Sequence, residues 1–129
     1  MAGERVLVVD DELSMREFLS ILLEQDGYTV EVASTAERAL MRMERSWPDL
    51  LLTDMNLPGA SGLELLQEAH ARAAQAGRDI QVVMVTGYGT EETAIEAMKL
   101  GAANYVRKPF NNDELRLVVR RALGIAELA

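Results

Sequence analysis

Short apolar runs alternate with segments that carry helix start and stop signals along the whole of this 129-residue chain. The apolar runs predict strands at residues 5–9, 29–33, 50–53, 80–85 and 103–106. The segments that follow them predict helices at residues 14–26, 35–45, 62–76, 91–100 and 113–123. Strict alternation of this kind favours a doubly wound α/β domain, because parallel strands need crossover connections and these are right-handed.

The order of the predicted strands follows from two further features. Residues 6–9 and 82–85 are almost continuously apolar, as in central strands that are covered on both faces. Residues 28–32 alternate between apolar and polar, which indicates an edge strand. The polar residues at the strand ends, described below, fit the flavodoxin-like order 2-1-3-4-5. We therefore expect a parallel sheet of five strands in that order, with five helices.

Capping residues mark most of the predicted helices. Three serine–glutamate pairs have the spacing of a capping box, in which a hydroxyl and a carboxylate satisfy free amides at a helix start: Ser14 with Glu17, Ser34 with Glu37, and Ser61 with Glu64. Thr90 and Asn112 are further N-cap candidates. Four glycines follow helical stretches, where a left-handed residue can close the last turn: Gly27, Gly77, Gly101 and Gly124.

The length of the chain suits a single domain over residues 1–129, with a core of about 4–123 and a tail or linker start at 124–129. A net charge of −8 argues against direct nucleic-acid binding, because phosphate neutralisation needs lysine and arginine. Cysteine is absent, which excludes disulfides and thiolate metal sites. No stretch resembles a secretory core or a membrane span, so we expect a soluble, cytoplasmic domain.

Polar residues follow four of the predicted strands at the point where each strand ends. Asp10 and Asp11 follow the first strand, and Asp54 follows the third. Thr86 follows the fourth strand, and Lys108 lies just past the fifth. Because the C-terminal ends of parallel strands meet at one edge of the sheet, three carboxylates, a hydroxyl and an ammonium should lie together there.

Three carboxylates at one point need a compensating cation. Two carboxylates about 4 Å apart repel each other by roughly 4 kcal/mol at an effective dielectric near 20. Lys108 supplies one positive charge, and a divalent ion would supply the rest. Oxygen ligands in small number favour Mg²⁺ over Zn²⁺ or Ca²⁺, because Mg²⁺ keeps several of its waters. A carboxylate beside Mg²⁺, a lysine and a hydroxyl suits phosphoryl transfer, which depends on alignment and charge neutralisation.

Several short motifs occur in order, each at its own strand end. They are the acidic pair Asp10–Asp11, the segment 53–59 around Asp54, Thr86 followed by Gly87, and Tyr105 ahead of Lys108–Pro109–Phe110. Together these motifs make the chain resemble the receiver domain of two-component response regulators over residues 4–123. A single motif would carry little weight, whereas all of them in this order are specific.

The resemblance implies a role for each site residue. Asp54 would accept a phosphoryl group from a phosphohistidine on a sensor kinase. Mg²⁺ would be bound by the carboxylates of Asp11 and Asp54 and the backbone carbonyl of Asn56, with Asp10 acting through water. The phosphoryl oxygens would be contacted by four groups: the Lys108 ammonium, the Thr86 hydroxyl, and the backbone N–H groups of Met55 and Gly87. A cis peptide bond before Pro109 would aim the lysine at the site.

The resemblance also implies a switch. Thr86 would move toward the phosphoryl group, and Tyr105 would rotate inward into the space that it leaves. The output surface formed by residues 91–100, 103–106 and 113–123 would then change shape. Asn56 and Tyr88, which flank the site, would tune the lifetime of the phosphoryl group.

A receiver of this kind is a signalling phosphoacceptor and not an enzyme, although it assists its own phosphorylation and autodephosphorylation. The implied partners are a sensor histidine kinase, an effector domain or downstream protein, and a second copy of the chain on phosphorylation. Residues 86–89 and 94–102 are similar to receivers of enhancer-binding transcription activators of the nitrogen-regulation type. A stand-alone receiver, acting in a phosphorelay or through protein–protein contacts, is the alternative.

Three other classes of function share parts of the pattern. A flavodoxin-type carrier has the same fold, but its first loop must hold a phosphate, and the acidic loop 10–12 repels one. A small phosphatase with an aspartyl nucleophile would need an Asp-x-Asp motif and a cap domain, which are not apparent in the sequence. A degenerate receiver would lack one of the site residues, and none of the expected positions is substituted.

Overall fold

The computed structural model describes residues 3–87 and 90–125 of the chain. Its strands are β1 (Arg5–Val9), β2 (Thr29–Ala33), β3 (Leu50–Thr53), β4 (Gln81–Thr86) and β5 (Asn104–Arg107). Its helices are α1 (Leu13–Gln25), α2 (Ala36–Arg45), α3 (Gly62–Ala76), α4 (Glu91–Lys99) and α5 (Asn112–Ala122). The predicted elements are all present, and no boundary differs from its prediction by more than one residue.

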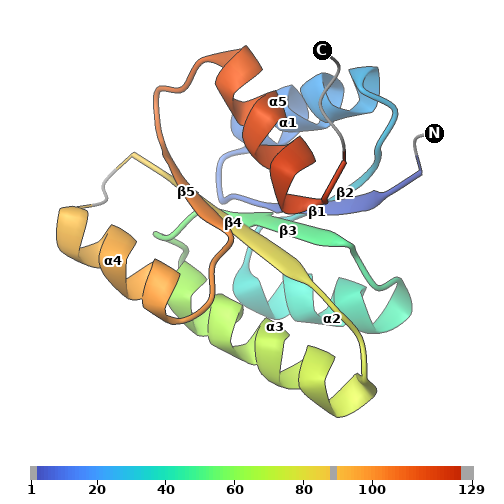
Figure 1. The fold of residues 1–129 in the computed structure, drawn as a ribbon, viewed down its shortest axis with the longest axis vertical. Coiled ribbons are helices and arrows are strands. Elements are labelled where there is room, and N and C mark those ends of the chain that lie inside the picture. The colour runs from blue at the N-terminus through green and yellow to red at the C-terminus, as the bar shows by residue number, and fades with distance from the viewer. Residues whose placement is uncertain (1–2, 88–89, 126–129) are drawn as a thin grey trace.

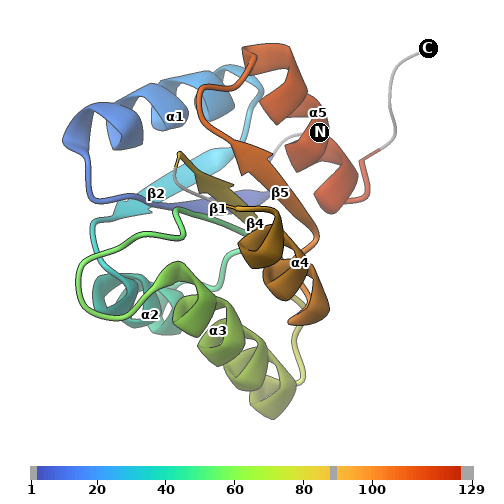
Figure 2. The same ribbon diagram turned by 90° about the vertical axis from the view of Figure 1, so that its left-hand side faces the viewer.

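The five strands form one parallel sheet in the order β2-β1-β3-β4-β5. This order confirms the flavodoxin-like prediction, and β2 is an edge strand as its alternating sequence indicated. Helices α1 and α5 cover one face of the sheet, and α2, α3 and α4 cover the other (Figures 1 and 2). The fold is therefore a three-layer α/β sandwich whose strand ends share one edge.

Each face of the sheet has its own hydrophobic core. Strand side chains alternate between the two cores, because successive residues point to opposite faces. Leu7, Leu51 and Met84 pack with α2, α3 and α4, whereas Val8 and Val83 pack with α1 and α5. All residues of β3 are buried, which agrees with the apolar run over residues 50–52. Burial on both faces fixes the register of the central strands and so the positions of the residues that follow them.

Some of the predicted helix starts are confirmed. Ser61 and Glu64 form a reciprocal capping box at α3. Thr90 caps α4, with Thr93 as the second member of its box. Gly77 adopts a left-handed conformation with φ 64° at the end of α3. The positive φ angles of Gly27, Gly101 and Gly124 likewise agree with their predicted places at helix ends.

Three other predicted caps are wrong. Helix α1 starts after Glu12 without a side-chain cap, so the predicted Ser14–Glu17 box lies inside the helix. The amide of Glu12 donates instead to the carboxylate of Asp10, which turns the chain into α1 early. Thr35 rather than Ser34 caps α2, and Asn111 rather than Asn112 caps α5. Both predictions chose the wrong one of two neighbouring residues with similar capping ability.

Among the helices that the structure describes, none is long and apolar enough to cross a membrane.

Candidate functional site

The carboxylates of Asp10 and Asp54 lie side by side because their strands are neighbours. Val9 pairs with Thr53 in the parallel ladder, and the amide of Asp54 donates to the Val9 carbonyl at 2.9 Å. The next residues of both strands therefore leave the sheet at the same edge. Asp10 is only 2 % exposed and Asp54 only 9 %. Carboxylate oxygens of Asp10, Asp11 and Asp54 lie within 4.8 Å of one another, with Asp11 on the solvent side.

Lys108 is the cation that faces this acidic group. Its Nζ donates to Asp10 Oδ2 at 2.7 Å and to Asp54 Oδ2 at 2.9 Å. The Lys108 amide is hydrogen-bonded to the Thr86 carbonyl, and the peptide bond before Pro109 is cis, as the resemblance implied. Burial lowers the pKa of Lys108, but hydrogen bonds with Asp10 and Asp54 outweigh this effect, so its pKa is raised overall. The lysine therefore remains an ammonium at neutral pH.

The second oxygen of each buried carboxylate is held by its own loop. Asp10 Oδ1 accepts from the amide of Glu12 at 2.9 Å, and Asp54 Oδ1 accepts from the amide of Asn56 at 2.9 Å. Each aspartate thus closes a local turn with an amide two residues further along. These bonds orient both carboxylates with one oxygen toward Lys108.

Thr86 lies at the end of β4 and is fully buried. Its hydroxyl oxygen accepts a 3.0 Å hydrogen bond from Nδ2 of Asn56. Met55 and Gly87 directly follow Asp54 and Thr86, so their amide groups belong to the loops that border the site. Tyr88, which the resemblance implied as a second flanking residue, lies outside the described residues.

Tyr105 lies one strand further along the sheet edge. It pairs with Met84 across β4 and β5, and it packs against the core beneath α2, α3 and α4. The residue is partly buried, and among the described residues its buried hydroxyl has no hydrogen-bond partner. Most buried polar side-chain groups have a hydrogen-bond partner, so this hydroxyl is an uncommon exception.

The residues at this edge fit a hard divalent cation. The three clustered carboxylates carry more negative charge than the single ammonium of Lys108 can balance. All of the side-chain donors are oxygen, which suits Mg²⁺. Among the described residues this is also the one cluster of three or more acidic or imidazole groups with metal-binding spacing. The site can therefore combine a divalent cation, a buried carboxylate and a neighbouring ammonium.

Sequence reasoning missed two contacts that shape the site. Gly62, at the start of α3, donates its amide to Met55 and packs so tightly that an added Cβ would lie 2.2 Å from the Asp54 carbonyl oxygen. Arg16 of α1 donates from Nη1 to the carbonyl of Asp10 at 2.8 Å. A glycine directly after a capping serine was the available signal for the first contact. Nothing in the sequence pattern indicated the second.

Fold and site together define a class: an α/β domain with a buried carboxylate, an acidic metal-compatible group and a facing lysine at one sheet edge. The sequence model described as the response regulator receiver domain matches residues 6–120. The chain therefore belongs to the receiver domain family of two-component response regulators, whose members are signalling phosphoacceptors.

Relatives of known name support the assignment. The phosphate regulon transcriptional regulatory protein PhoB of Escherichia coli K12 is 39% identical over 128 residues, covering 96% of this chain and 55% of PhoB. The regulatory protein AtoC of the same organism is 36% identical over 98% of this chain and 27% of its own length. The crystal structure of the receiver domain of NtrX from Brucella abortus superimposes with a TM-score of 0.84 at 36% identity, covering 94% of this chain and 99% of that one. The chain thus spans about half the length of PhoB and about a quarter of AtoC.

Proposed function

We propose that Asp54 accepts a phosphoryl group from the phosphohistidine of a sensor kinase. In this step a carboxylate oxygen of Asp54 forms a bond to phosphorus, the nitrogen–phosphorus bond of the phosphohistidine breaks, and its electron pair stays on the imidazole. The observation that carries the proposal is the placement of a buried carboxylate 2.9 Å from the Lys108 ammonium, inside an acidic cluster. Burial keeps competing water away from the acceptor, and the ammonium faces the position where negative charge develops.

The neighbouring residues divide the remaining tasks. A Mg²⁺ ion held by Asp11, Asp54 and the backbone carbonyl of Asn56, with Asp10 acting through water, would neutralise phosphoryl charge. Lys108 exchanges its bond with Asp54 for one with a phosphoryl oxygen, which its flexible stem allows. The amides of Met55 and Gly87 and the Thr86 hydroxyl are donors for the other oxygens. Attack of water on the acyl phosphate, with Asn56 at the rim, gives autodephosphorylation.

The proposed change of the output surface begins with the hydrogen bond between Asn56 and Thr86. When Thr86 turns to the phosphoryl group it gives up this bond, and Tyr105 moves inward, changing the surface formed by α4, β5 and α5. Two observations support this choice of surface: the Tyr105 hydroxyl has no partner in the part of the chain that the structure describes, and the apolar side chains of Ile95 and Met98 on α4 are exposed. Binding of an effector domain, or of a second copy, at this surface would pass the signal on.

The outcome of the signal is proposed from the relatives. PhoB is named as a transcriptional regulatory protein, so we propose that this cytoplasmic receiver, with its core at residues 4–123, controls a transcriptional effector. The alternative is a receiver that acts alone in a phosphorelay.

Size-exclusion chromatography of the phosphorylated chain tests whether phosphorylation drives dimerisation. An unchanged elution volume would count against a dimerising switch.

Intact-mass spectrometry tests the acceptor function. The chain is incubated with acetyl phosphate and Mg²⁺, and we expect the mass to increase by one phosphoryl group. Asp54→Asn should abolish the increase, whereas the matched control Asp79→Asn, at an exposed aspartate outside the site, should retain it. An unmodified parent, or an Asp54→Asn variant that is still phosphorylated, would overturn the proposal.

A further inference from the structure

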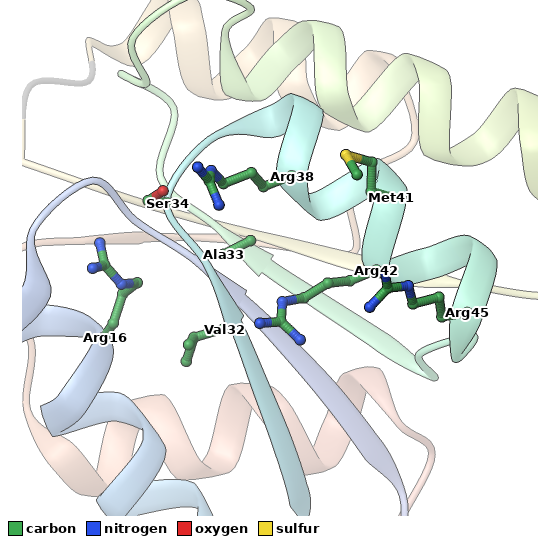
Figure 3. Close-up of a pocket in the computed structure, with 8 residues that line it drawn as sticks. All are labelled: Arg16, Val32, Ala33, Ser34, Arg38, Met41, Arg42 and Arg45. Carbon is green, nitrogen blue, oxygen red and sulfur yellow. The ribbon is translucent and has the colours of Figure 1, made fainter.

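A cavity of about 550 Å³ lies at the β2 edge of the sheet, between the N-terminal half of α1 and helix α2. Four arginines line it, with apolar and small residues between them (Figure 3). We call it the arginine cavity, and its lining residues are Arg16, Val32, Ala33, Ser34, Arg38, Met41, Arg42 and Arg45. Four of the 13 lysines and arginines of the chain therefore lie around one cavity, although the chain as a whole has a net charge of −8.

Three of these arginines form a row on α2. Arg38, Arg42 and Arg45 have the i, i+4, i+7 spacing of one helix face. Figure 3 shows the guanidinium groups of Arg38 and Arg42 turned toward β2, with Arg16 on the other side of that strand. Within the described parts of the chain, the three α2 side chains make no hydrogen bond or ion pair. Arg16 uses one donor, Nη1, on the Asp10 carbonyl.

The acidic residues of α2 point away from this row. Glu44 forms a 2.7 Å ion pair with Arg72 of α3. The carboxylate of Glu37 lies toward Gly59, about 3.4 Å from where a Cβ of that glycine would be. Glu37 lines a different cavity, between α2 and α3. The helix therefore separates its charges, with the acids toward α3 and the arginines toward the edge strand.

Helix electrostatics do not explain the arginine row. Cations are favourable in the last turn of a helix, which accounts for Arg42 and Arg45. Arg38 lies in the first turn of α2, where the helix dipole disfavours a cation, and Arg16 lies on another helix. Neighbouring like charges without counter-ions destabilise a surface. An anionic ligand would remove this cost.

The anion must be compact and must carry more than one charged group. Helix geometry places Arg38 and Arg45 about 10 Å apart along the axis, a distance that one phosphate ion does not bridge. A long polyanion would extend over the acidic remainder of the protein, whereas a compact ligand stays within one Debye length, about 8 Å, of the arginines. Guanidinium groups bind phosphate oxygens in pairs, and Val32, Ala33 and Met41 offer apolar contact to an organic group.

We propose that the arginine cavity binds a compact organic polyphosphate of the nucleoside di- or triphosphate class. The volume of the cavity lies within the usual range for small-molecule sites. The lining of the cavity includes none of the acceptor-site side chains, and its two hydrogen bonds with Asp10 go to the backbone: Arg16 donates to the Asp10 carbonyl, and the Ala33 carbonyl accepts from the Asp10 amide. Binding can therefore be measured without Mg²⁺ and does not depend on phosphorylation of Asp54.

Calorimetry and amide NMR in EDTA test the proposal, with inorganic triphosphate, ATP and adenosine as probes. We expect triphosphate and ATP to bind at one site, with shifts at residues 34–45, and adenosine not to bind. The double variant Arg42→Gln/Arg45→Gln should weaken binding about tenfold or more, since it removes charge-assisted hydrogen bonds. Arg107→Gln makes one of the same neutral replacements at the opposite sheet edge, and it should change affinity less than about twofold.

The Arg42→Lys/Arg45→Lys variant keeps the charge but loses the planar fork, so it should bind with intermediate affinity. Circular dichroism shows whether each variant is folded. Failure of both triphosphate and ATP to bind would overturn the proposal, as would shifts centred on Lys108. Equal loss of affinity in Arg107→Gln would reduce the effect to net charge. Tighter binding of a hexaglutamate peptide than of triphosphate would assign the cavity to an acidic protein segment instead.

Discussion

The side-chain amide of Asn56 donates a 3.0 Å hydrogen bond to the hydroxyl of Thr86, a residue 30 positions further along the chain. This bond joins the loop after β3 to the end of β4, directly beside the carboxylate of Asp54. It holds the oxygen of the hydroxyl that, in our account, must turn to donate to a phosphoryl group. Asn56 therefore acts as a restraint on the unphosphorylated state.

Asn56→Ala should release this restraint. One side-chain hydrogen bond contributes about 1 kcal/mol, so the balance between the two states should shift about fivefold toward the phosphorylated form. In NMR spectra of the unphosphorylated variant, we expect the Thr86 and Gly87 amides to move part of the way along the line from the unphosphorylated to the phosphorylated parent. Asn112→Ala, at an exposed asparagine of α5, is the control. Movement off that line would show that the bond does not bias the switch.

Lys108→Met should destabilise the protein in EDTA by about 3 kcal/mol, because it leaves Asp10 and Asp54 buried without their cation. It should also increase the stabilisation gained from Mg²⁺, since the ion then compensates the carboxylates alone. Urea unfolding with and without Mg²⁺ measures both effects. Lys99→Met is a matched control, because Lys99 is the only other lysine and lies exposed on α4. Equal stability of the Lys108 variant and the parent in EDTA would contradict this prediction.

Gly62→Ala should destabilise the domain by about 2 kcal/mol and slow phosphorylation. The added Cβ would lie 2.2 Å from the Asp54 carbonyl oxygen, so either α3 or the acceptor loop must shift. Gly77→Ala is the comparison, since Gly77 has a left-handed φ of 64° and no neighbour near its Cβ position. That variant should lose stability through backbone strain alone and keep its phosphorylation rate. Equal phosphorylation rates in both variants would show that the close contact does not position Asp54.

The stability of the domain should fall at alkaline pH through Tyr28. Burial raises the pKa of Tyr28, with further increases from the negative charges of Asp26 and Glu4. Between the unfolded-state pKa, about 10, and the higher folded-state pKa, the folded protein binds more protons, so stability decreases as pH rises. Tyr28→Phe should show a shallower decline in unfolding free energy above pH of about 10. Parallel declines in the two proteins would rule out this contribution.

Much of the site could be predicted because parallel strands end at one sheet edge. Burial of residues 6–9 of β1 and of all of β3 fixes their register, and the register then places Asp10 beside Asp54. The order of the strands was decided by the same polar residues, since only neighbouring strands bring these carboxylates together. The strand order and the acidic cluster therefore both follow from one sequence pattern, in which buried apolar strands are followed directly by polar residues.

Contacts between side chains of distant loops could not be predicted in this way. The bond from Asn56 to Thr86 depends on side-chain torsions, which residue type alone does not set. The arginine cavity depends on how α2 is rotated about its axis, which determines that Arg42 faces β2 and Glu44 faces α3. Two predicted N-caps were wrong for a similar reason, since residue type alone does not distinguish adjacent candidates such as Ser34 and Thr35.

The position of the phosphoryl group is the central claim, and borohydride reduction measures it most directly. Borohydride converts an aspartyl phosphate to homoserine, and peptide mass spectrometry then locates the changed residue. After treatment with acetyl phosphate and Mg²⁺, we predict homoserine at position 54 alone, with Asp10 and Asp11 unchanged. Homoserine at either of those positions, or at none, would contradict the account.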